Sequence, residues 1–233
     1  MKKIKRIVAL GCTVIMACMT MNMPVLAYSD CNNEAVATLT KLEILSGYDD
    51  GTFKPEGLIT RAELAKIVTV ISGGEDFNST PSRENPFSDI DNNHWAFDYI
   101  LYCASSRFVD GYEDGTFKPN ENVSFAEAVK VCLTVTGYSS LVTVQTENWY
   151  EPWIDLAYQY KIIDSKDKDP NSKATRVEVA ELISKTINLP LCMTTGYELR
   201  DGVFVPTTEF ADGTVIENGV KKPFMSLLTE YFK

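Results

Sequence analysis

The sequence has little of the chemistry that enzymes and metal sites use most often. It contains one histidine, His94, so a histidine-centred triad or metal site has a single candidate residue. Its six cysteines include no Cys-x-x-Cys pair, which is the spacing typical of structural zinc. We therefore expect no catalytic residue, no metal and no cofactor. A carboxylate pair of the glycosidase kind stays open, because sequence alone does not exclude it.

Positive charge is also scarce. The chain has 22 Lys and Arg against 32 Asp and Glu, a net charge of −10. Nucleic acids and anionic lipids are bound mainly through cations, so neither is expected as a partner. Any anionic ligand must therefore be held by a local group of cations against an acidic surface.

Only one apolar run is long, and it lies at the start of the chain. A basic segment with four cations precedes the apolar residues 7–19, and the small-residue site Val25-Leu26-Ala27 follows. This order is typical of a secretory signal peptide, and the run is short for a membrane span. We predict a signal peptide over residues 1–27, a secreted protein and no membrane span after cleavage. A lipoprotein site at Ile15-Met-Ala-Cys18 is the alternative. Cleavage leaves 18 cations against 32 anions, a net charge of −14.

Four cysteines remain after cleavage, and four cysteines allow three disulfide pairings. Export makes disulfides feasible. However, Cys103 and Cys132 fall at apolar positions of predicted helices, where cysteine acts as a small core residue. We expect these two in the core, with a disulfide as the second interpretation; the other two are Cys31 and Cys192.

An internal duplication organises the rest of the chain. Gly47-Tyr-Asp-Asp-Gly-Thr-Phe-Lys-Pro55 returns 64 residues later at 111–119, with eight of nine positions identical. Each copy precedes a capping box, Thr60-Arg-Ala-Glu63 and Ser124-Phe-Ala-Glu127, in which a hydroxyl and a Glu bind backbone N–H groups. Gly47 is predicted to hold the left-handed conformation just past a helix end. The repeating unit is therefore a helix, a structured loop and a capped helix.

Apolar residues at helical spacing flank each loop. A third, degraded copy follows: its loop over residues 164–173 is shorter, but Thr175-Arg-Val-Glu178 restores the capping box. The inner positions of the six helices are Val36, Leu39 and Thr40; Leu64, Ile67, Val68 and Ile71; Ile100, Cys103 and Ala104; Ala128, Val131, Cys132 and Val135; Ile154, Ala157 and Tyr158; and Val179, Leu182 and Ile183.

One helical pair cannot bury its apolar face alone, so three units should pack together. We predict an all-α fold with a first repeat and linker at 28–86, a second repeat at 87–147 and a third at 148–190. Residues 191–233 do not repeat. Their Asp-Gly and Asn-Gly turn signals predict a hairpin, and residues 223–232 a last short helix, together an appendage packed on the third repeat.

The repeats resemble the S-layer homology family. The residues that carry the resemblance are Phe87-Ser-Asp89, His94-Trp-Ala96, Gly111-Tyr112, Asp114-Gly-Thr-Phe-Lys-Pro119 and Thr60-Arg-Ala-Glu63. The resemblance implies a pseudo-threefold bundle of three repeats. It also implies a non-catalytic module of the cell wall or S-layer that attaches exported proteins to secondary cell-wall polysaccharide. The ligand, often a pyruvylated amino sugar, would lie in grooves between neighbouring repeats.

The residues support a site of that kind. A capped helix start offers free N–H groups and a positive dipole end, which favour an anion. Arg61 and Arg176 lie at the first position of such helices, where the planar guanidinium suits a carboxylate. Lys54 and Lys118 add charge in this interpretation. The flat faces for a sugar ring would come from Tyr48, Tyr112, Trp95 and Trp149.

Some of these residues can have a purely structural role, and two positions differ from the family pattern. The two tryptophans can equally be core residues, and Tyr48, Tyr112, Phe53 and Phe117 are more often loop packing than stacking faces. Glu63, Glu127 and Glu178 are expected as caps. Phe125 stands where the family has arginine, so the second repeat's own groove is expected to be weakened or lost, and each arginine is assigned to the groove of its own repeat. Cys31 falls where the first repeat would have tryptophan. We therefore expect one or two functional grooves, with the Arg61 site the most secure.

Two further functions stay open. The repeats can serve as an S-layer scaffold that assembles with other envelope proteins. The loop at 167–178 also places Asp167, Asp169, Asn171 and Glu178 at calcium-ligand positions of an EF-hand loop, although Ser172 stands where that loop needs glycine.

Overall fold

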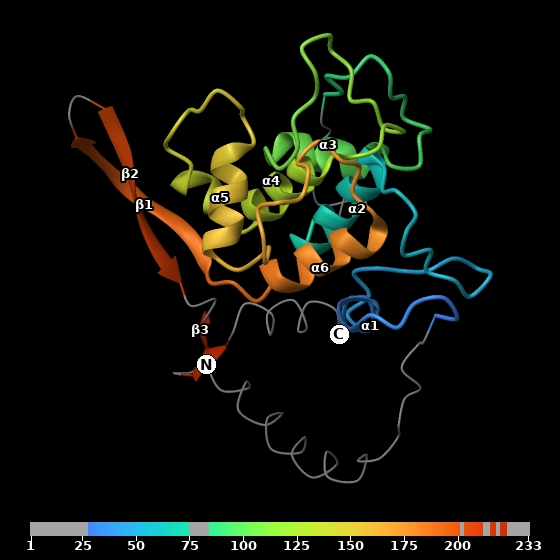
Figure 1. Cartoon of the computed structure of the whole chain (residues 1–233). Helices are drawn as coiled ribbons and strands as arrows, with labels where there is room; N and C mark the ends of the chain where they lie inside the picture. The colour runs from blue at the N-terminus through green and yellow to red at the C-terminus, as the bar shows by residue number, and fades with distance from the viewer. Residues whose placement is uncertain (1–27, 75–83, 201–202, 212–214, 218–219, 223–233) are drawn as a thin grey trace, which may run out of the picture.

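The computed structural model describes residues 28–74, 84–200, 203–211, 215–217 and 220–222 (Figure 1). The predicted signal peptide and the predicted last helix lie outside these residues. Within them the fold is mostly helical, with a small C-terminal hairpin, as predicted. No described helix has the length and apolar character needed to cross a membrane. The helices are α1 (Glu34–Lys41), α2 (Arg61–Ile71), α3 (Phe97–Ser105), α4 (Phe125–Val135), the 3₁₀ turn η2 (Tyr138–Leu141), α5 (Glu151–Gln159) and α6 (Arg176–Thr186).

The three inner helices, α2, α4 and α6, all begin with the predicted capping box. The Thr60 hydroxyl accepts a hydrogen bond from the backbone N–H of Glu63, whose carboxylate accepts one from the N–H of Thr60. The same exchange occurs in α4 and α6. The predicted caps are therefore confirmed, and each inner helix starts at a fixed residue directly after its loop.

A ring of backbone hydrogen bonds ties the three helix starts together. The N–H of Ile59 donates to the carbonyl of Ala174 at 3.2 Å, Ala174 donates to Val123 at 2.9 Å, and Val123 donates back to Ile59 at 3.0 Å. These three side chains are at most 1% exposed. Buried backbone groups must be paired. Each extended segment finds its partners only in the other two repeats, which is why the units assemble around a common centre.

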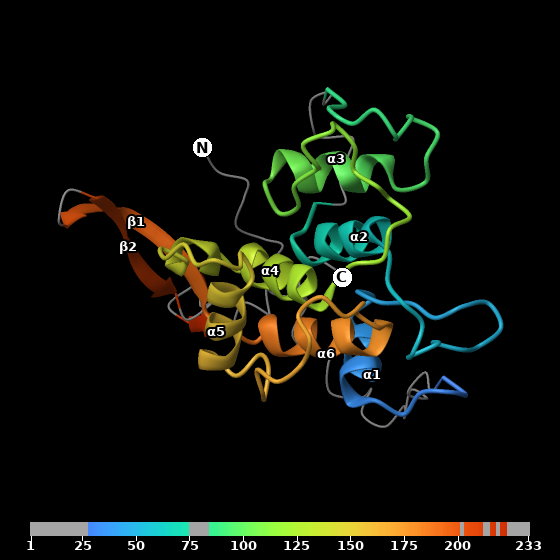
Figure 2. The ribbon, with the colours of Figure 1, turned by 45° about the horizontal axis from the view of Figure 1, so that its top comes forward.

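The outer helices pack on the inner helix of the preceding repeat. Contacts join α3 to α2, α5 to α4 and α1 to α6, and the same neighbours lie side by side in Figure 1 and Figure 2. The pair α1 and α6 closes the ring between the first and last helices. Each repeat therefore completes its core with residues of a neighbour, and any hollow beside an inner helix is built from more than one repeat.

The prediction for Gly47 was wrong. The left-handed residue after α1 is Glu43, with φ of 60°, and the equivalent residues are Arg107 and Lys161. Gly47 is needed for space instead: a Cβ there would lie 2.2 Å from Cε1 of Tyr28 and 2.6 Å from the carbonyl of Thr52. Gly111 is restricted in the same way by the ring of an aromatic residue. The glycine therefore marks close packing beneath the loop rather than a helix end.

The C-terminal segment forms the predicted hairpin. Strand β1 (Leu191–Arg200) pairs antiparallel with β2 (Val203–Ala211), and the short β3 (Val215–Glu217) pairs with β4 (Val220–Lys222). The hairpin contacts mainly η2 rather than the third repeat, because the N–H of Cys192 donates to the carbonyl of Thr136 at 3.0 Å. The appendage is therefore anchored just after α4.

The core prediction for the cysteines is confirmed. Cys103 is 0% and Cys132 is 5% exposed, and all four described cysteines are free thiols. The thiol of Cys103 donates to the carbonyl of Ala65 at 3.3 Å. Burial raises the pKa of Cys132 to about 12, so this thiol stays protonated and unreactive at neutral pH.

Candidate functional site

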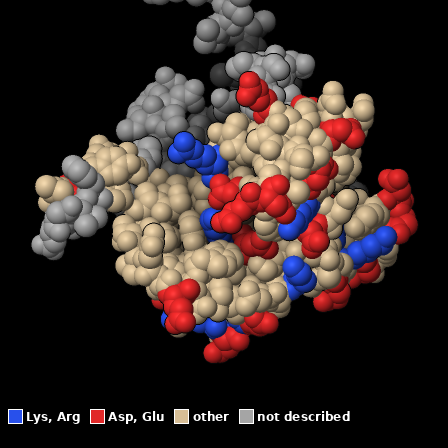
Figure 3. Space-filling view, turned by 90° about the horizontal axis from the view of Figure 1, so that it is seen from above, with Lys and Arg blue, Asp and Glu red and all other residues tan. Residues whose placement is uncertain are grey.

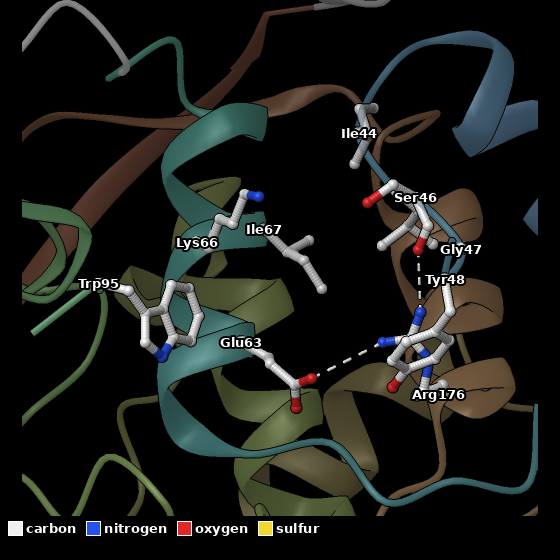
Figure 4. A pocket seen from close by; sticks show the side chains of 10 residues that line it. Ile44, Ser46, Gly47, Tyr48, Glu63, Lys66, Ile67, Trp95 and Arg176 are labelled. Atoms are coloured by element: carbon white, nitrogen blue, oxygen red, sulfur yellow. Dashed lines mark hydrogen bonds and ion pairs between the residues drawn. The ribbon is translucent and has the colours of Figure 1, made fainter. Parts of the chain in front are cut away.

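Two hollows with matching walls lie between the repeats. We call them groove A, of about 300 Å³, and groove B, of about 520 Å³. Groove A is lined by residues 44–48, by Glu63, Lys66 and Ile67 of α2, by Trp95 and by Arg176 (Figure 4). Groove B is lined by residues 108–113, by Glu127, Lys130 and Val131 of α4, by Trp149 and by Arg61. Every lining position of groove A has its repeat equivalent in groove B.

Each groove takes residues from all three helical pairs. In groove A the loop and α2 belong to the first pair, Trp95 precedes α3 of the second pair, and Arg176 begins α6 of the third. Sequence reasoning assigned each arginine to the groove of its own repeat. The structure corrects this, because Arg176 lies in the groove of the first loop and Arg61 in that of the second.

Arg61 clamps the loop of groove B. Its Nε donates to the carbonyl of Phe117 at 2.7 Å and its Nη2 to the carbonyl of Asp110 at 2.8 Å. Nη1 lies 3.5 Å from the carboxylate of Glu127. The guanidinium is also 4.7 Å from the ring centre of Tyr112 and 4.6 Å from that of Phe117. At 7% exposure, Arg61 fixes the loop and offers only an edge to the groove.

Arg176 repeats this arrangement in groove A, as Figure 4 shows in part. Nε donates to the carbonyl of Phe53 at 2.9 Å and Nη2 to that of Ser46 at 3.0 Å. Its Nη1 lies 3.9 Å from the carboxylate of Glu63. The contacts are slightly longer than those of Arg61. Both arginines are therefore loop clamps that also line a groove, which differs from the free planar fork expected from the sequence.

The helix starts do not offer free N–H groups, and this prediction was wrong. The N–H of Arg61 donates to the carbonyl of Glu121 at 2.9 Å, and the N–H of Ala62 donates to that of Pro119 at 3.0 Å. The third N–H is taken by the capping hydroxyl of Thr60. The first two N–H groups of α6, from Arg176 and Val177, are occupied in the same way. Neighbouring loops use the donors that an anion would need.

The aromatic residues predicted for the site do face the grooves. Trp95 is 56% and Trp149 is 49% exposed, so both lie in groove walls rather than in the core. Tyr48 and Tyr112 are about two-fifths exposed, at 41% and 39%. By contrast, the loop phenylalanines are buried, as expected of packing residues. Each groove thus offers one indole and one phenol face.

Lys54 and Lys118 are not among the residues that line the grooves. The ammonium of Lys54 lies 3.9 Å from the ring centre of Tyr48 and 3.7 Å from the carboxylate of Asp50. Lys118 has the equivalent contacts, at 4.1 Å and 3.8 Å. Both lysines have positive φ, 55° and 57°. They support the tyrosines from the loop and do not contribute charge to the groove lining.

Sequence reasoning missed the lysines that do line the grooves. Lys66 follows Glu63 by three residues in α2, and Lys130 follows Glu127 by three in α4. Residues three apart share one face of a helix. The signal in the sequence was a lysine three residues after the capping Glu in both good repeats, which places the two side chains on the same face of the helix.

A second missed feature is Tyr28-Ser-Asp30, the equivalent in the first repeat of Phe87-Ser-Asp89. The carboxylate of Asp30 accepts hydrogen bonds from the N–H groups of Phe53 and Lys54, both at 2.8 Å. The bond from Phe53 is the main cause that lowers the pKa of Asp30. Asp89 binds the second loop in the same way. The aromatic-Ser-Asp triplet, directly after the predicted cleavage site, was the signal.

The third junction, between the second and third pairs, is built differently. Phe125 occupies the arginine position, and the ammonium of Lys168 lies 5.0 Å from its ring centre and pairs with Glu178. Glu181 stands where grooves A and B have lysine. Burial alone would raise the pKa of Glu178, but hydrogen bonds from Lys168 and from the N–H of Thr175 hold it below its usual value. A loop lysine therefore replaces the arginine as partner of the capping Glu.

The loop proposed to bind calcium has other contacts. The carboxylate of Asp169 accepts from the N–H of Asn171 at 2.9 Å, and that of Asp167 accepts from the hydroxyl of Ser165. Glu178 is held by its lysine and its cap. Within the part of the chain that the structure describes, no three His, Cys, Asp or Glu are grouped to hold a metal ion. The geometry gives the calcium hypothesis no support.

Comparisons with known proteins agree with this architecture. The family model described as "S-layer homology domain" matches residues 29–65 and 86–129. "Cell surface glycoprotein 1" of Acetivibrio thermocellus is 43% identical over 89 residues, which are 38% of this chain and 4% of that protein. "Middle cell wall protein" of Brevibacillus brevis is 27% identical over 200 residues, 86% of this chain and 17% of that protein.

Other relatives include an anchoring protein and two enzymes. "Cellulosome-anchoring protein" of Acetivibrio thermocellus is 38% identical over 87 residues, 37% of this chain and 20% of that protein. An amylopullulanase and an exoglucanase also align with this chain. The chain spans at most a fifth of the length of the three relatives described first. The ranges matched by the family model contain both groove loops, Trp95 and Arg61, whereas the groove residues Lys66, Lys130, Trp149 and Arg176 lie outside them. The chain therefore contains S-layer homology domain sequence at residues 29–65 and 86–129.

Proposed function

We propose that this chain is a non-catalytic anchoring module of the cell wall that binds a secondary cell-wall polysaccharide in grooves A and B. The observation that carries the proposal is the equivalence of the two grooves, position by position, at junctions assembled from three repeats. Packing alone does not require an exposed tryptophan and a lysine at equivalent places in both grooves. The names of the relatives, which include cell-surface, cell-wall and anchoring proteins, support the same function.

Both grooves offer an aromatic face to a sugar ring, and the chemistry of groove A also fits a sugar that carries a carboxylate. An indole face packs against the apolar C–H face of a sugar ring, and a nearby ammonium attracts an anion. The arginine clamps hold the loop in place before the ligand arrives, which reduces the entropy lost on binding. A pyruvylated amino sugar has both the ring and the carboxylate, and we propose it as the recognised group.

The third helical pair contributes residues to both grooves. We propose that α5 and α6 are a degenerate S-layer homology repeat that supplies Trp149 to groove B and Arg176 to groove A. The proposed boundaries are 28–86, 87–147 and 148–190 for the repeats and 191–233 for the appendage. The β1–β2 hairpin favours a second candidate function, contact with another envelope protein, because it projects from the bundle with Tyr197 and Leu199 more than 60% exposed (Figure 1).

Co-sedimentation tests the anchoring function. The protein is mixed with purified cell walls before and after chemical removal of the secondary polysaccharide. We expect binding to intact walls and loss of binding to stripped walls. Binding that survives stripping would favour assembly with a protein and reject the polysaccharide. Incubation with the walls should release no new reducing ends, since a release would indicate catalysis.

The best variants for this assay avoid the arginines, because their loss disturbs the fold. Trp95→Ala and Trp149→Ala each remove an exposed groove wall, and the double variant should lose most of the binding. Tyr158→Ala is the matched control: this α5 aromatic is 49% exposed, like Trp149, but does not line groove A or B. Equal binding by the double variant and the control would reject the grooves as the site.

A further inference from the structure

The two grooves are equivalent in shape but not in charge. We propose that groove A is the anion-selecting groove and that groove B discriminates against anionic ligands, with the side chain at position 46 or 110 deciding between them. The inference rests on the proposed function, since it assumes that both grooves bind sugars. It reverses the expectation from the sequence that the Arg61 groove is the more secure site.

The charges of the lining residues differ by two units. One unit comes from Asp110 in place of Ser46, and the other arises because Glu113 lines groove B whereas its equivalent Asp49, also acidic, is not among the lining residues of groove A. The difference in side-chain charge between the two repeats is therefore the one at positions 46 and 110. Groove A has two cations, Arg176 and Lys66, and one carboxylate, Glu63, so its net charge is +1. Groove B also has two cations but three carboxylates, so its net charge is −1. The charged residues of groove B are Arg61, Lys130, Asp110, Glu113 and Glu127.

The difference in charge between the grooves is greatest around the lysine that lines each of them, Lys66 in groove A and Lys130 in groove B. In groove B the ammonium of Lys130 lies 3.4 Å from the carboxylate of Asp110. Groove A has Ser46 at the position of Asp110, and no acidic side chain of the described residues lies within 4 Å of the ammonium of Lys66. In Figure 4 this ammonium points from α2 toward the loop that holds Ser46. Lys66 is therefore available to a carboxylate, whereas Lys130 is already paired.

The surrounding surface makes this local difference important. The chain carries a net negative charge, and on the face seen in Figure 3 acidic side chains gather in groups with basic side chains beside some of them. An anion that reaches such a surface is repelled unless a local excess of cations holds it. Of the two grooves, only groove A has such an excess.

The side chains at positions 46 and 110 can be substituted without removing the hydrogen bonds that Arg61 and Arg176 make to these loops. Ser46 and Asp110 bind the arginines through their backbone carbonyls, and both side chains are exposed. Ser46→Asp, Ser46→Asn and Asp110→Ser therefore change the charge beside the lysine while the arginine contacts remain. Ser46→Asn is the matched control, since asparagine has the shape of aspartate without its charge.

The experiment measures each groove separately by NMR. The chain has three tryptophans, and their ¹⁵N-labelled indole signals can be assigned with Trp→Phe variants. Trp95 then reports on groove A, Trp149 on groove B, and Trp153 is the internal reference. The probe is the methyl glycoside of a pyruvylated N-acetylhexosamine. Its uncharged counterpart is the same compound with the pyruvyl carboxylate as a methyl ester.

We expect the Trp95 signal to saturate at a probe concentration at least about tenfold lower than the Trp149 signal, as one or two charges near a carboxylate predict. The methyl ester should remove most of this difference. Ser46→Asp should weaken binding in groove A about tenfold, Ser46→Asn should leave it within about twofold, and Asp110→Ser should strengthen groove B.

Each contrary outcome has a distinct meaning. Equal saturation of both signals, or tighter binding at Trp149, would overturn the inference and leave the grooves as the binding site. Equal weakening by Ser46→Asp and Ser46→Asn would show that shape rather than charge decides, which also overturns it. If neither signal responds to the probe, its ester or purified wall polysaccharide, the proposed function itself fails.

Discussion

Removal of Arg61 should destabilise the bundle strongly. The substitution Arg61→Ala deletes the guanidinium that joins the start of α2 to the loop of the second repeat. It leaves the carbonyls of Phe117 and Asp110 without these donors and takes away the cation beside Glu127. Because Phe117 is 0% exposed, water cannot easily replace the lost bond there.

The magnitude follows from the two charged hydrogen bonds. A hydrogen bond to a charged group contributes about 1.5–3 kcal/mol, and an exposed ion pair adds less than about 1 kcal/mol. With Arg61 only 7% exposed, solvent screening is small, and we expect a loss of about 3–5 kcal/mol. Arg176→Ala should cost less, about 2–3 kcal/mol, because its bonds are longer.

Urea unfolding followed by far-ultraviolet circular dichroism measures this loss as a lower midpoint at an unchanged slope. Arg61→Lys is the control. A lysine keeps the charge but not the planar fork, so it should recover only about half of the loss.

A loss below about 1 kcal/mol for Arg61→Ala would refute the clamp. Full recovery by Arg61→Lys would also refute the role of the guanidinium geometry, because charge alone would then suffice. A loss of wall binding in Arg61→Ala can be assigned to the groove only at temperatures and urea concentrations where the variant is folded.

Two further predictions concern the loop and the third junction. Gly47→Ala should lower the free energy of unfolding by about 1–3 kcal/mol, since the new methyl group would overlap the ring of Tyr28. Gly51→Ala should lower it by only about 1 kcal/mol, because the sole cost is its φ of 79° and no atom lies within 4 Å of the new Cβ. Equal shifts in melting temperature for the two variants would contradict this. Glu178→Gln should cost about 1 kcal/mol at pH 7, where the carboxylate with its lowered pKa is ionised and pairs with Lys168. This cost should shrink as the pH falls below about 4.5 toward the lowered pKa, because the carboxylate of the unfolded chain takes up a proton in that range while the native one stays ionised. A pH-independent difference in urea unfolding would reject the pairing.

Much of the fold was predictable because it is encoded locally. The capping boxes at Thr60 and Ser124 need only residues three apart, and the apolar stripes need only helical spacing. The burial of Cys103 followed from its place in such a stripe. Turn signals also gave the C-terminal hairpin, although its docking beside Thr136 depends on a contact that no local pattern records.

The candidate site was predictable in its aromatic residues but not in its charges. Trp95, Trp149, Tyr48 and Tyr112 belong to recurring motifs, and the grooves contain all four. Which arginine serves which groove was not readable from the chain, because α6 meets the first loop only when the ring closes through α1.

The sequence by itself determined the duplication, the helix starts and the resemblance to the S-layer homology domain, because nearly identical loops and recurring capping boxes follow one another along the chain. Only the tertiary structure decided what those helix starts do. Their N–H groups and arginines find partners in loops far away in the sequence, so groups that seemed free for a ligand hold the repeats together. The same packing brought Lys66 and Trp95, from different repeats, to the wall of one groove.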